Sequence, residues 1–163
     1  MQELSPDDIR GSFVNATKGE AGRVPLPGLH EVIWAEREYL GWRDQQSPQR
    51  GYLVHWVDDR PVGLVLRASE FSLNPGIAAM CSWCRITRRS DEITLFSAAR
   101  AGEAGREGNT IGTYVCDDLA CSHLIRILPP PHPLQDPQEL LQSRIDGLVT
   151  RVQAFTAELM KTA

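Results

Sequence analysis

Alternating apolar and polar positions predict a β-hairpin in the first half of the chain. Residues 51–57 and 61–67 are rich in β-branched and aromatic side chains, and the polar residues 58–60 separate the two stretches. We interpret them as adjacent antiparallel strands of the core sheet. His55 lies inside the first strand, so we expect it to be a packed or hydrogen-bonded core histidine rather than a metal ligand.

Later segments predict two more strands, and the segments before the hairpin are less regular. Residues 92–100 alternate as a half-buried strand does, a glycine-containing loop follows at 101–108, and residues 109–115 form the returning strand. Residues 17–28 are dense in glycine and proline, which favours a loop. For residues 29–42 the mixed pattern predicts a short strand or helical turn followed by a strand.

The N-terminal segment carries a helix start signal. Ser5 can cap the helix, Pro6 fits its first position, and Asp8 stands three residues after the cap. Ile9 and the apolar residues that follow at helical spacing lie on one face. We therefore predict a short amphipathic helix that runs to about Ala16 and docks on a larger element.

A proline-rich segment at 129–137 precedes a second helix. Such a run favours extended polyproline II structure and fits a stiff spacer, with partner binding as the alternative. Asp136 and Pro137 repeat the cap-and-proline start, and a continuous apolar stripe predicts a helix over 138–163. We expect the stripe to pack on the chain's own sheet or first helix, and the protein to be a monomer; a homodimeric helix pair is the alternative. The stripe consists of Leu141, Ile145, Leu148, Val152, Phe155 and Leu159.

The composition is that of a globular protein with one domain. The chain has 163 residues, of which 42% are hydrophobic, and no stretch approaches the roughly 20 apolar residues of a membrane span. The acidic N-terminal segment lacks the basic region of a secretory signal, so we expect a cytoplasmic protein without membrane contact. The formal net charge of −4 argues against a protein that mainly wraps nucleic acid.

All four cysteines fall in two close pairs. Cys81 and Cys84 form a Cys-x2-Cys knuckle, and Cys116 and Cys121 follow after a segment long enough for a hairpin. Each pair can span one edge of a ligand tetrahedron, which predicts one structural zinc ion held by four thiolates. The alternatives are two disulfides, free core thiols, a redox pair, or iron in a rubredoxin-like site. The missing secretory signal argues against disulfides.

The elements around the cysteines follow a treble-clef-like order of knuckle, hairpin and helix. Asp117 and Asp118 can cap that helix, which places Cys121 in or near its first turn. We predict an α+β fold: a small antiparallel sheet with a four-cysteine treble-clef-like zinc finger, flanked by an N-terminal helix and a long C-terminal helix. We assign residues 1–128 to an α+β domain with the finger at about 77–128, residues 129–137 to a linker, and residues 138–163 to the C-terminal helix.

A site with four thiolate ligands has no open coordination position, so we interpret it as structural rather than catalytic. The His-x-Glu element of zinc deaminases and the Gly-x-Ser-x-Gly element of hydrolases are both missing from the sequence. We therefore do not expect an enzyme. His123, two residues after Cys121, is an alternative ligand in place of one cysteine.

Basic residues gather after the first knuckle, where five arginines stand against three acidic residues. Trp83 lies between two cysteines, where we expect its side chain to point outward. An exposed aromatic beside arginines suits a protein interface or a base-stacking platform for RNA. A solvated charged face with Trp83 packed over the site is the alternative. The arginines are Arg85, Arg88, Arg89, Arg100 and Arg106.

Several short motifs along the chain form a recognisable set. They are Tyr-Leu-Gly-Trp-Arg-Asp at 39–44, Tyr52 with Val-Gly-Leu-Val-Leu-Arg at 62–67, Cys-Ser-Trp-Cys at 81–84, and Thr-Tyr-Val-Cys at 113–116 with Cys-Ser at 121–122. The set resembles the elongation factor G-binding (FBP) family, whose best-known members are fusidic-acid resistance proteins. The likeness covers residues 40–126 and is most specific at the cysteine pairs, and it implies that Cys81, Cys84, Cys116 and Cys121 are zinc ligands.

The resemblance also implies a partner. In that family a C-terminal treble-clef zinc domain binds elongation factor G and promotes its release from the ribosome, through aromatic and basic residues around the zinc hairpin. Trp83 and Tyr114 stand at matching places, and we add Arg85 and Arg88 from the charge pattern. Direct binding of ribosomal or other RNA through the arginine-rich region is the alternative function.

Overall fold

The computed structural model of the chain describes residues 1–71, 73–74, 76–130 and 133–161. Two residues of the segment before the first cysteine pair and two of the predicted proline-rich spacer lie outside the described residues, as do the last two residues of the predicted C-terminal helix. They are Ser72, Pro75, Pro131, His132, Thr162 and Ala163.

Seven strands, five α-helices and three 3₁₀ helices follow one another in the described residues. The strands are β1 (Leu40–Arg43), β2 (Arg50–Val57), β3 (Arg60–Ala68), β4 (Ala78–Met80), β5 (Thr87–Arg89), β6 (Ile93–Ala99) and β7 (Thr110–Cys116). The α-helices are α1 (Pro6–Ser12), α2 (Lys18–Gly22), α3 (Gly102–Arg106), α4 (Cys121–Leu124) and α5 (Pro137–Met160), and the 3₁₀ helices are η1 (Leu29–Glu31), η2 (Trp34–Glu36) and η3 (Ser90–Glu92).

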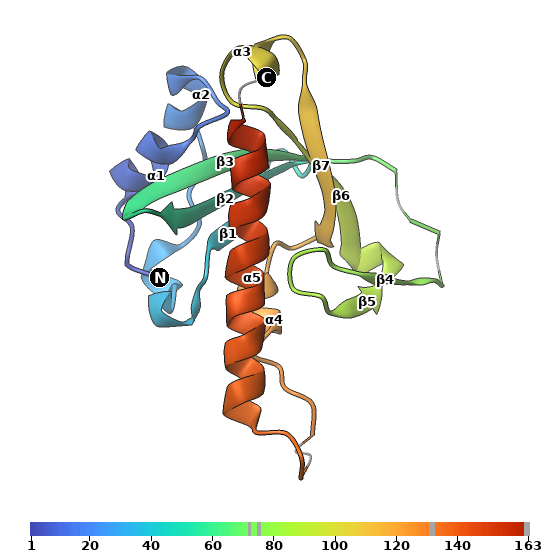
Figure 1. Cartoon of the computed structure of the whole chain (residues 1–163). Helices are drawn as coiled ribbons and strands as arrows, with labels where there is room; N and C mark the ends of the chain where they lie inside the picture. The colour runs from blue at the N-terminus through green and yellow to red at the C-terminus, as the bar shows by residue number, and fades with distance from the viewer. Residues whose placement is uncertain (72, 75, 131–132, 162–163) are drawn as a thin grey trace.

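A five-stranded antiparallel sheet with the strand order β1-β2-β3-β6-β7 forms the centre of the molecule (Figure 1). The strands β4 and β5 form a separate two-stranded hairpin. The predicted α+β fold with an antiparallel sheet and a long C-terminal helix is confirmed. The helices of the described residues include none with the length and hydropathy of a membrane span.

The hairpin of β2 and β3 is closed by a two-residue turn. Asp58 and Asp59 both have positive φ angles, of 46° and 60°. Turns with two left-handed residues match the right-handed twist of paired strands, and aspartate tolerates this conformation better than most residues do. The turn sets a register that places Leu53 opposite Leu64, so both side chains face the same core.

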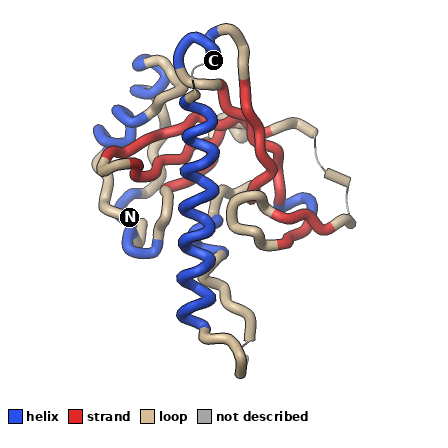
Figure 2. Tube along the Cα trace, in the orientation of Figure 1, coloured by secondary structure: helices blue, strands red, loops and turns tan. Residues whose placement is uncertain are grey.

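Helices from the two ends of the chain cover opposite faces of the sheet. Successive residues of β2 alternate between two hydrophobic cores: Tyr52 and Val54 pack with Ile9 of α1, whereas Leu53 belongs to the core that contains Leu148 of α5. Figures 1 and 2 show α5 running across the front of the sheet, with α1 and α2 at its left. This arrangement explains why β2 is apolar on both of its faces.

The predicted N-terminal helix forms with the predicted cap but is shorter. The Ser5 Oγ accepts from the backbone N of Asp8 at 3.1 Å, and the Asp8 carboxylate accepts from the backbone N of Ser5 at 2.9 Å. The helix ends at Ser12 rather than near Ala16, because the chain turns extended there and the backbone N of Val14 donates to the Gly63 carbonyl at 3.0 Å.

Two segments predicted as loops contain short helices instead. Thr17 caps α2, and the Glu20 carboxylate accepts in return from the backbone N of Thr17 at 2.9 Å. This reciprocal pair offsets the poor helix propensity of the neighbouring glycines. In the second segment, α3 begins after Ala101 and buries Ala104. The pure loop interpretation of both segments was therefore wrong.

The C-terminal helix packs on the chain's own sheet, as predicted. Asp136 caps α5 by accepting from the backbone N of Gln138 at 2.8 Å. Leu148, Val152 and Leu159 of the apolar stripe are buried in the core of the sheet. The same helix packs over the cysteine region, and this packing determines which side chains of that region are buried.

The interpretation of His55 as a hydrogen-bonded core histidine is confirmed. Its Nε2 lies 2.7 Å from the Thr156 Oγ1, so the imidazole joins β2 to α5. Burial lowers the pKa of His55 from 6.5 to about 4. The folded protein therefore keeps this side chain neutral in a pH range where an unfolded chain would protonate it.

We expect acid to destabilise the protein partly through His55. Its contribution to stability is present above the unfolded pKa of 6.5 and is lost as the pH falls toward the folded value of about 4. Over this window the free energy of unfolding should fall by up to about 3 kcal/mol more in the wild type than in His55→Gln. Denaturant titrations at a series of pH values measure the difference, since all other titrating groups are common to both proteins. Parallel pH profiles would contradict the prediction.

Candidate metal centre

The four cysteines lie together in the core. All four are buried and free of disulfides, and their Sγ atoms lie within 4.8 Å of one another. The Sγ atoms of Cys81 and Cys121 are 3.6 Å apart, and those of Cys84 and Cys116 are 3.7 Å apart. Zinc–sulfur bonds of about 2.3 Å give a tetrahedron with edges of about 3.8 Å. The cluster therefore fits one structural zinc ion, and its sulfur separations do not fit disulfides.

The two pairs are delivered by different elements. Cys81 directly follows β4, and a knuckle turn lets the backbone N of Cys84 donate to the Cys81 Sγ at 3.4 Å. Cys116 is the last residue of β7, one residue beyond the predicted strand, and Cys121 is the first residue of α4, within the predicted first turn. Leu119 has a φ of 55°, and this left-handed residue reverses the chain between the second pair.

The predicted caps of α4 do not form: Ala120 is the N-cap residue, and no side chain caps the helix. The Asp118 Oδ1 accepts from the backbone N of Ala120 at 3.0 Å, in the turn just before the helix. The Asp117 carboxylate instead accepts from Arg43 at 2.6 Å and from the hydroxyl of Thr94 at 2.8 Å. Asp117 thus ties the second cysteine pair to β1 and β6.

Thiols this close to one another cannot all ionise unless a cation balances their charge. Hydrogen bonds from the Cys116 and Cys121 thiols lower the pKa of Cys81. Hydrogen bonding with Cys116 and then with Cys81 raises the pKa of Cys121. A divalent cation removes this competition, because it stabilises four thiolates together and displaces their protons.

Tyr39 supports the cluster and was not predicted to do so. Its hydroxyl donates to the Leu119 carbonyl at 2.9 Å and accepts from the backbone N of Cys121 at 3.3 Å. Burial, followed by the nearby Cys121, raises the pKa of Tyr39 well above 10.0, which keeps the hydroxyl protonated for this contact. A Cβ atom on Gly41 would lie 2.8 Å from the Leu119 carbonyl oxygen, so glycine allows β1 to approach this turn. Tyr39 and Gly41 both belong to the 39–44 motif, which is the sequence signal that could have identified their role.

Trp83 is buried, so the expectation that it points outward was wrong. Its side chain is 2% exposed. The indole packs edge-on against Tyr39 and Phe155, with ring centroids 5.8 and 5.6 Å away. The side chain turns inward because α5 covers the knuckle, and Arg151 of that helix donates to the Trp83 carbonyl. Trp83 packs over the site and offers no surface to a partner.

The arginine-rich region is largely neutralised by ion pairs. Arg88 contacts Glu92 at 2.7 Å and Asp118 at 3.4 Å. Its pKa is raised, because Cys116 and these carboxylates outweigh the opposing effect of burial. Arg89 and Arg100 pair with Asp91 and Glu158. The expected basic surface therefore has fewer unpaired arginines than the sequence suggests. Arg88 contributes to the structure through its ion pairs.

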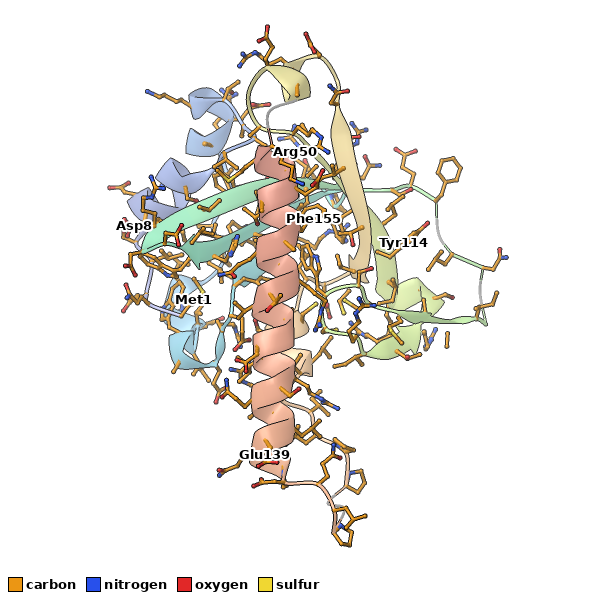
Figure 3. The ribbon with its side chains drawn as sticks, viewed as in Figure 1. Met1, Asp8, Arg50, Tyr114, Glu139 and Phe155 are labelled. Atoms are coloured by element: carbon orange, nitrogen blue, oxygen red, sulfur yellow. The ribbon has the colours of Figure 1, made fainter. Side chains whose placement is uncertain are left out.

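Tyr114 and Arg85 remain exposed beside the cluster. The Tyr114 side chain is 42% exposed and lies on the face of β7 opposite to the buried Val115. Figure 3 labels it on the far side of β6 and β7 from Phe155 of α5. Arg85 directly follows the knuckle. His123 is also exposed, and it is not part of the cluster found among the described residues, which contains cysteines alone.

A comparison with solved structures finds a similar fold in the fusidic acid resistance protein FusC. The match has a TM-score of 0.50 and 18% sequence identity, and covers 85% of this chain and 52% of FusC. The chain thus spans about half the length of that protein. Among curated proteins, none matches the sequence at a significant level.

A comparison with family models gives a match over nearly the whole chain. Residues 8–159 match the model described as the FBP C-terminal treble-clef zinc-finger. The matched range includes all four cysteines, and the motif resemblance seen in the sequence is confirmed. The chain therefore belongs to the FBP C-terminal treble-clef zinc-finger family.

Proposed function

We propose that the chain is a non-enzymatic cytoplasmic protein that binds elongation factor G and modulates its release from the ribosome. In this proposal Cys81, Cys84, Cys116 and Cys121 hold one zinc ion that stiffens the binding surface. The observation that carries the proposal is the buried four-cysteine cluster in a chain of the FBP family. Because four thiolates fill the coordination sphere of zinc, the metal supports structure and does not activate a water molecule.

Exposed apolar side chains beside the cluster support a protein partner. Tyr114 is 42% exposed, and its backbone carbonyl accepts from the backbone N of Ser82 at 2.8 Å, so its position is tied to the knuckle. Met80 and Ile77, just before Cys81, are 53% and 59% exposed. Large apolar side chains that are rigidly held and accessible are typical of residues that anchor protein interfaces.

The backbone conformation of Arg85 is a second reason to assign partner binding to this surface. It is exposed, has a φ of 62°, and forms no ion pair with any described residue. A left-handed conformation costs an L-residue about 1 kcal/mol relative to glycine, and such strain is concentrated at functional positions. A glycine would fit this turn better, so we assign the side chain of Arg85 to partner binding.

Replacing Arg85 by glycine should separate stability from binding. We expect Arg85→Gly to raise the free energy of unfolding by up to about 1 kcal/mol, because the turn strain is relieved. The same variant should bind elongation factor G about tenfold more weakly, because a charged hydrogen-bond donor is lost. Denaturant unfolding and a binding titration check the two effects. A variant that is destabilised, or that binds as well as the wild type, would contradict this assignment.

A titration of the protein with purified elongation factor G at low and moderate salt tests the proposed function. Aromatic and apolar burial predicts a complex that survives moderate salt. Binding of RNA alone would instead weaken steeply with salt, because counterion release dominates such binding. RNA binding is the less favoured alternative, since Arg88, Arg89 and Arg100 are already paired with carboxylates. No complex with the factor at either salt concentration would refute the proposal.

A further inference from the structure

A polar groove lies on the face of the central sheet opposite to α5. It has a volume of about 1040 Å³ and lies between α2, the β1–β2 connection and the ends of β3, β6 and β7. Three arginines line it, Arg23 after α2, Arg50 at the start of β2 and Arg67 near the end of β3. We propose that this groove binds a small ligand that carries two or more phosphate groups.

The arginines of the groove differ from those around the cysteine cluster. None of Arg23, Arg50 and Arg67 forms an ion pair with a described residue, and all three are exposed. A guanidinium has five donors in a planar fork that matches phosphate oxygens. Three unpaired guanidiniums from separate segments can therefore converge on one anionic ligand.

Two of these arginines face each other in an unfavourable arrangement. Arg50 and Arg67 are direct cross-strand partners in the β2–β3 register. Like charges at directly opposed positions destabilise a sheet, and no described carboxylate forms an ion pair with either of them. An anion between them would turn this repulsion into two favourable contacts.

The two acidic residues of the groove are occupied with other donors. The Glu20 carboxylate accepts from the backbone N and the hydroxyl of Thr17, at 2.9 and 2.8 Å. The Asp44 carboxylate accepts from the backbone N of Gln46 at 2.8 Å and from the hydroxyl of Tyr52 at 3.2 Å. The hydrogen bonds with Thr17, and then the charges of Arg50 and Arg23, lower the pKa of Glu20. The carboxylates therefore balance part of the positive charge of the groove, and the three arginines outnumber them, which leaves a net positive charge for a ligand.

The shape and composition of the groove favour a small phosphorylated molecule over RNA. Its volume is close to that of pockets for small molecules. Among the described residues that line it, Tyr52 is the one aromatic; it is 2% exposed and has no free ring face for base stacking. The hydroxyl of Thr110 adds a neutral hydrogen-bonding group, whereas the Asn15 amide already bonds the backbone of Val65 and Ala99 and helps to fix the wall of the groove. The chain is acidic overall, which disfavours a long polyanion but not a compact one.

Calorimetric titration of the full chain with sodium pyrophosphate, a nucleoside triphosphate and a short single-stranded RNA tests the proposal. We expect saturable binding of the first two probes. Arg50→Gln and Arg67→Gln should each weaken that binding about tenfold or more, since each removes a charged donor. Arg60→Gln is the matched control, because Arg60 is exposed at the other end of β3 and does not line the groove.

A second measurement uses the stability of the protein without a ligand. Arg67→Gln should raise the midpoint of thermal unfolding by about 1–3 °C, because it removes the opposed like-charge pair, while Arg60→Gln should leave it unchanged.

The proposal is overturned if neither pyrophosphate nor the nucleotide binds. Equal losses of binding in Arg60→Gln, or binding of the RNA probe alone, would overturn it as well. None of these outcomes depends on elongation factor G.

Discussion

Removal of the zinc ion should lower the midpoint of thermal unfolding by about 10 °C or more. The four cysteines are all in the same core cluster as Leu53, Phe96 and Leu148. Loss of the ion would remove the metal–thiolate bonds that join these residues, and the binding free energy of a structural zinc ion is part of the free energy of folding. The knuckle, the end of β7 and α4 should lose their fixed positions first, because the cysteines are their common anchor.

Thermal unfolding with and without a chelator, on protein whose metal content has been determined, measures this effect. Cys116→Ser provides the matched variant. It should unfold at the same lowered temperature as the chelated wild type and should no longer respond to the chelator. Added zinc should restore the wild type alone. A wild-type protein that loses its metal completely and keeps its full stability would contradict the prediction.

Trp83→Ala should be one of the most destabilising single substitutions in the chain. The indole is 2% exposed and fills the space between Tyr39 and Phe155. Truncation leaves a cavity between the metal centre and α5, so we expect a loss of about 3–5 kcal/mol in the free energy of unfolding. Denaturant unfolding measures the loss directly.

Tyr114→Ala is the control for Trp83→Ala. Its side chain is 42% exposed on the outer face of β7, so its truncation should change the free energy of unfolding by less than about 0.5 kcal/mol. Trp83 would thus have the structural role and Tyr114 the binding role. Similar stability losses in both variants would show that this division is wrong.

Local signals in the sequence account for most of what could be predicted. Caps such as Ser5 and Asp136 act on neighbouring residues, and the pairing of β2 with β3 depends on a short turn. The spacing of the cysteines likewise predicts a shared site, because close ligands must converge on one ion. The capping pair of Thr17 and Glu20 was also a local signal, but the glycines around it favoured a loop.

The orientation of individual side chains at the site could not be predicted, because distant segments determine it. Trp83 points inward since α5, which lies far along the chain, packs over the knuckle. The charge of Arg88 is compensated by Asp118, whose proximity depends on the turn between β7 and α4. The contact of Tyr39 with Leu119 has the same origin. Contacts between distant segments leave no pattern in the composition of the chain or in the spacing of its residues.

The most direct test of the proposed function is size-exclusion co-migration with purified elongation factor G. The samples are the wild type, Tyr114→Ala, and Ile33→Ala as a control for an exposed apolar residue in the segment between η1 and η2, each with its zinc content measured. We expect about one zinc per chain in all three proteins, and a complex with the wild type and Ile33→Ala only. Stoichiometric zinc without a complex in the wild type, or an undiminished complex with Tyr114→Ala, would contradict the proposal that the zinc-supported face binds the factor.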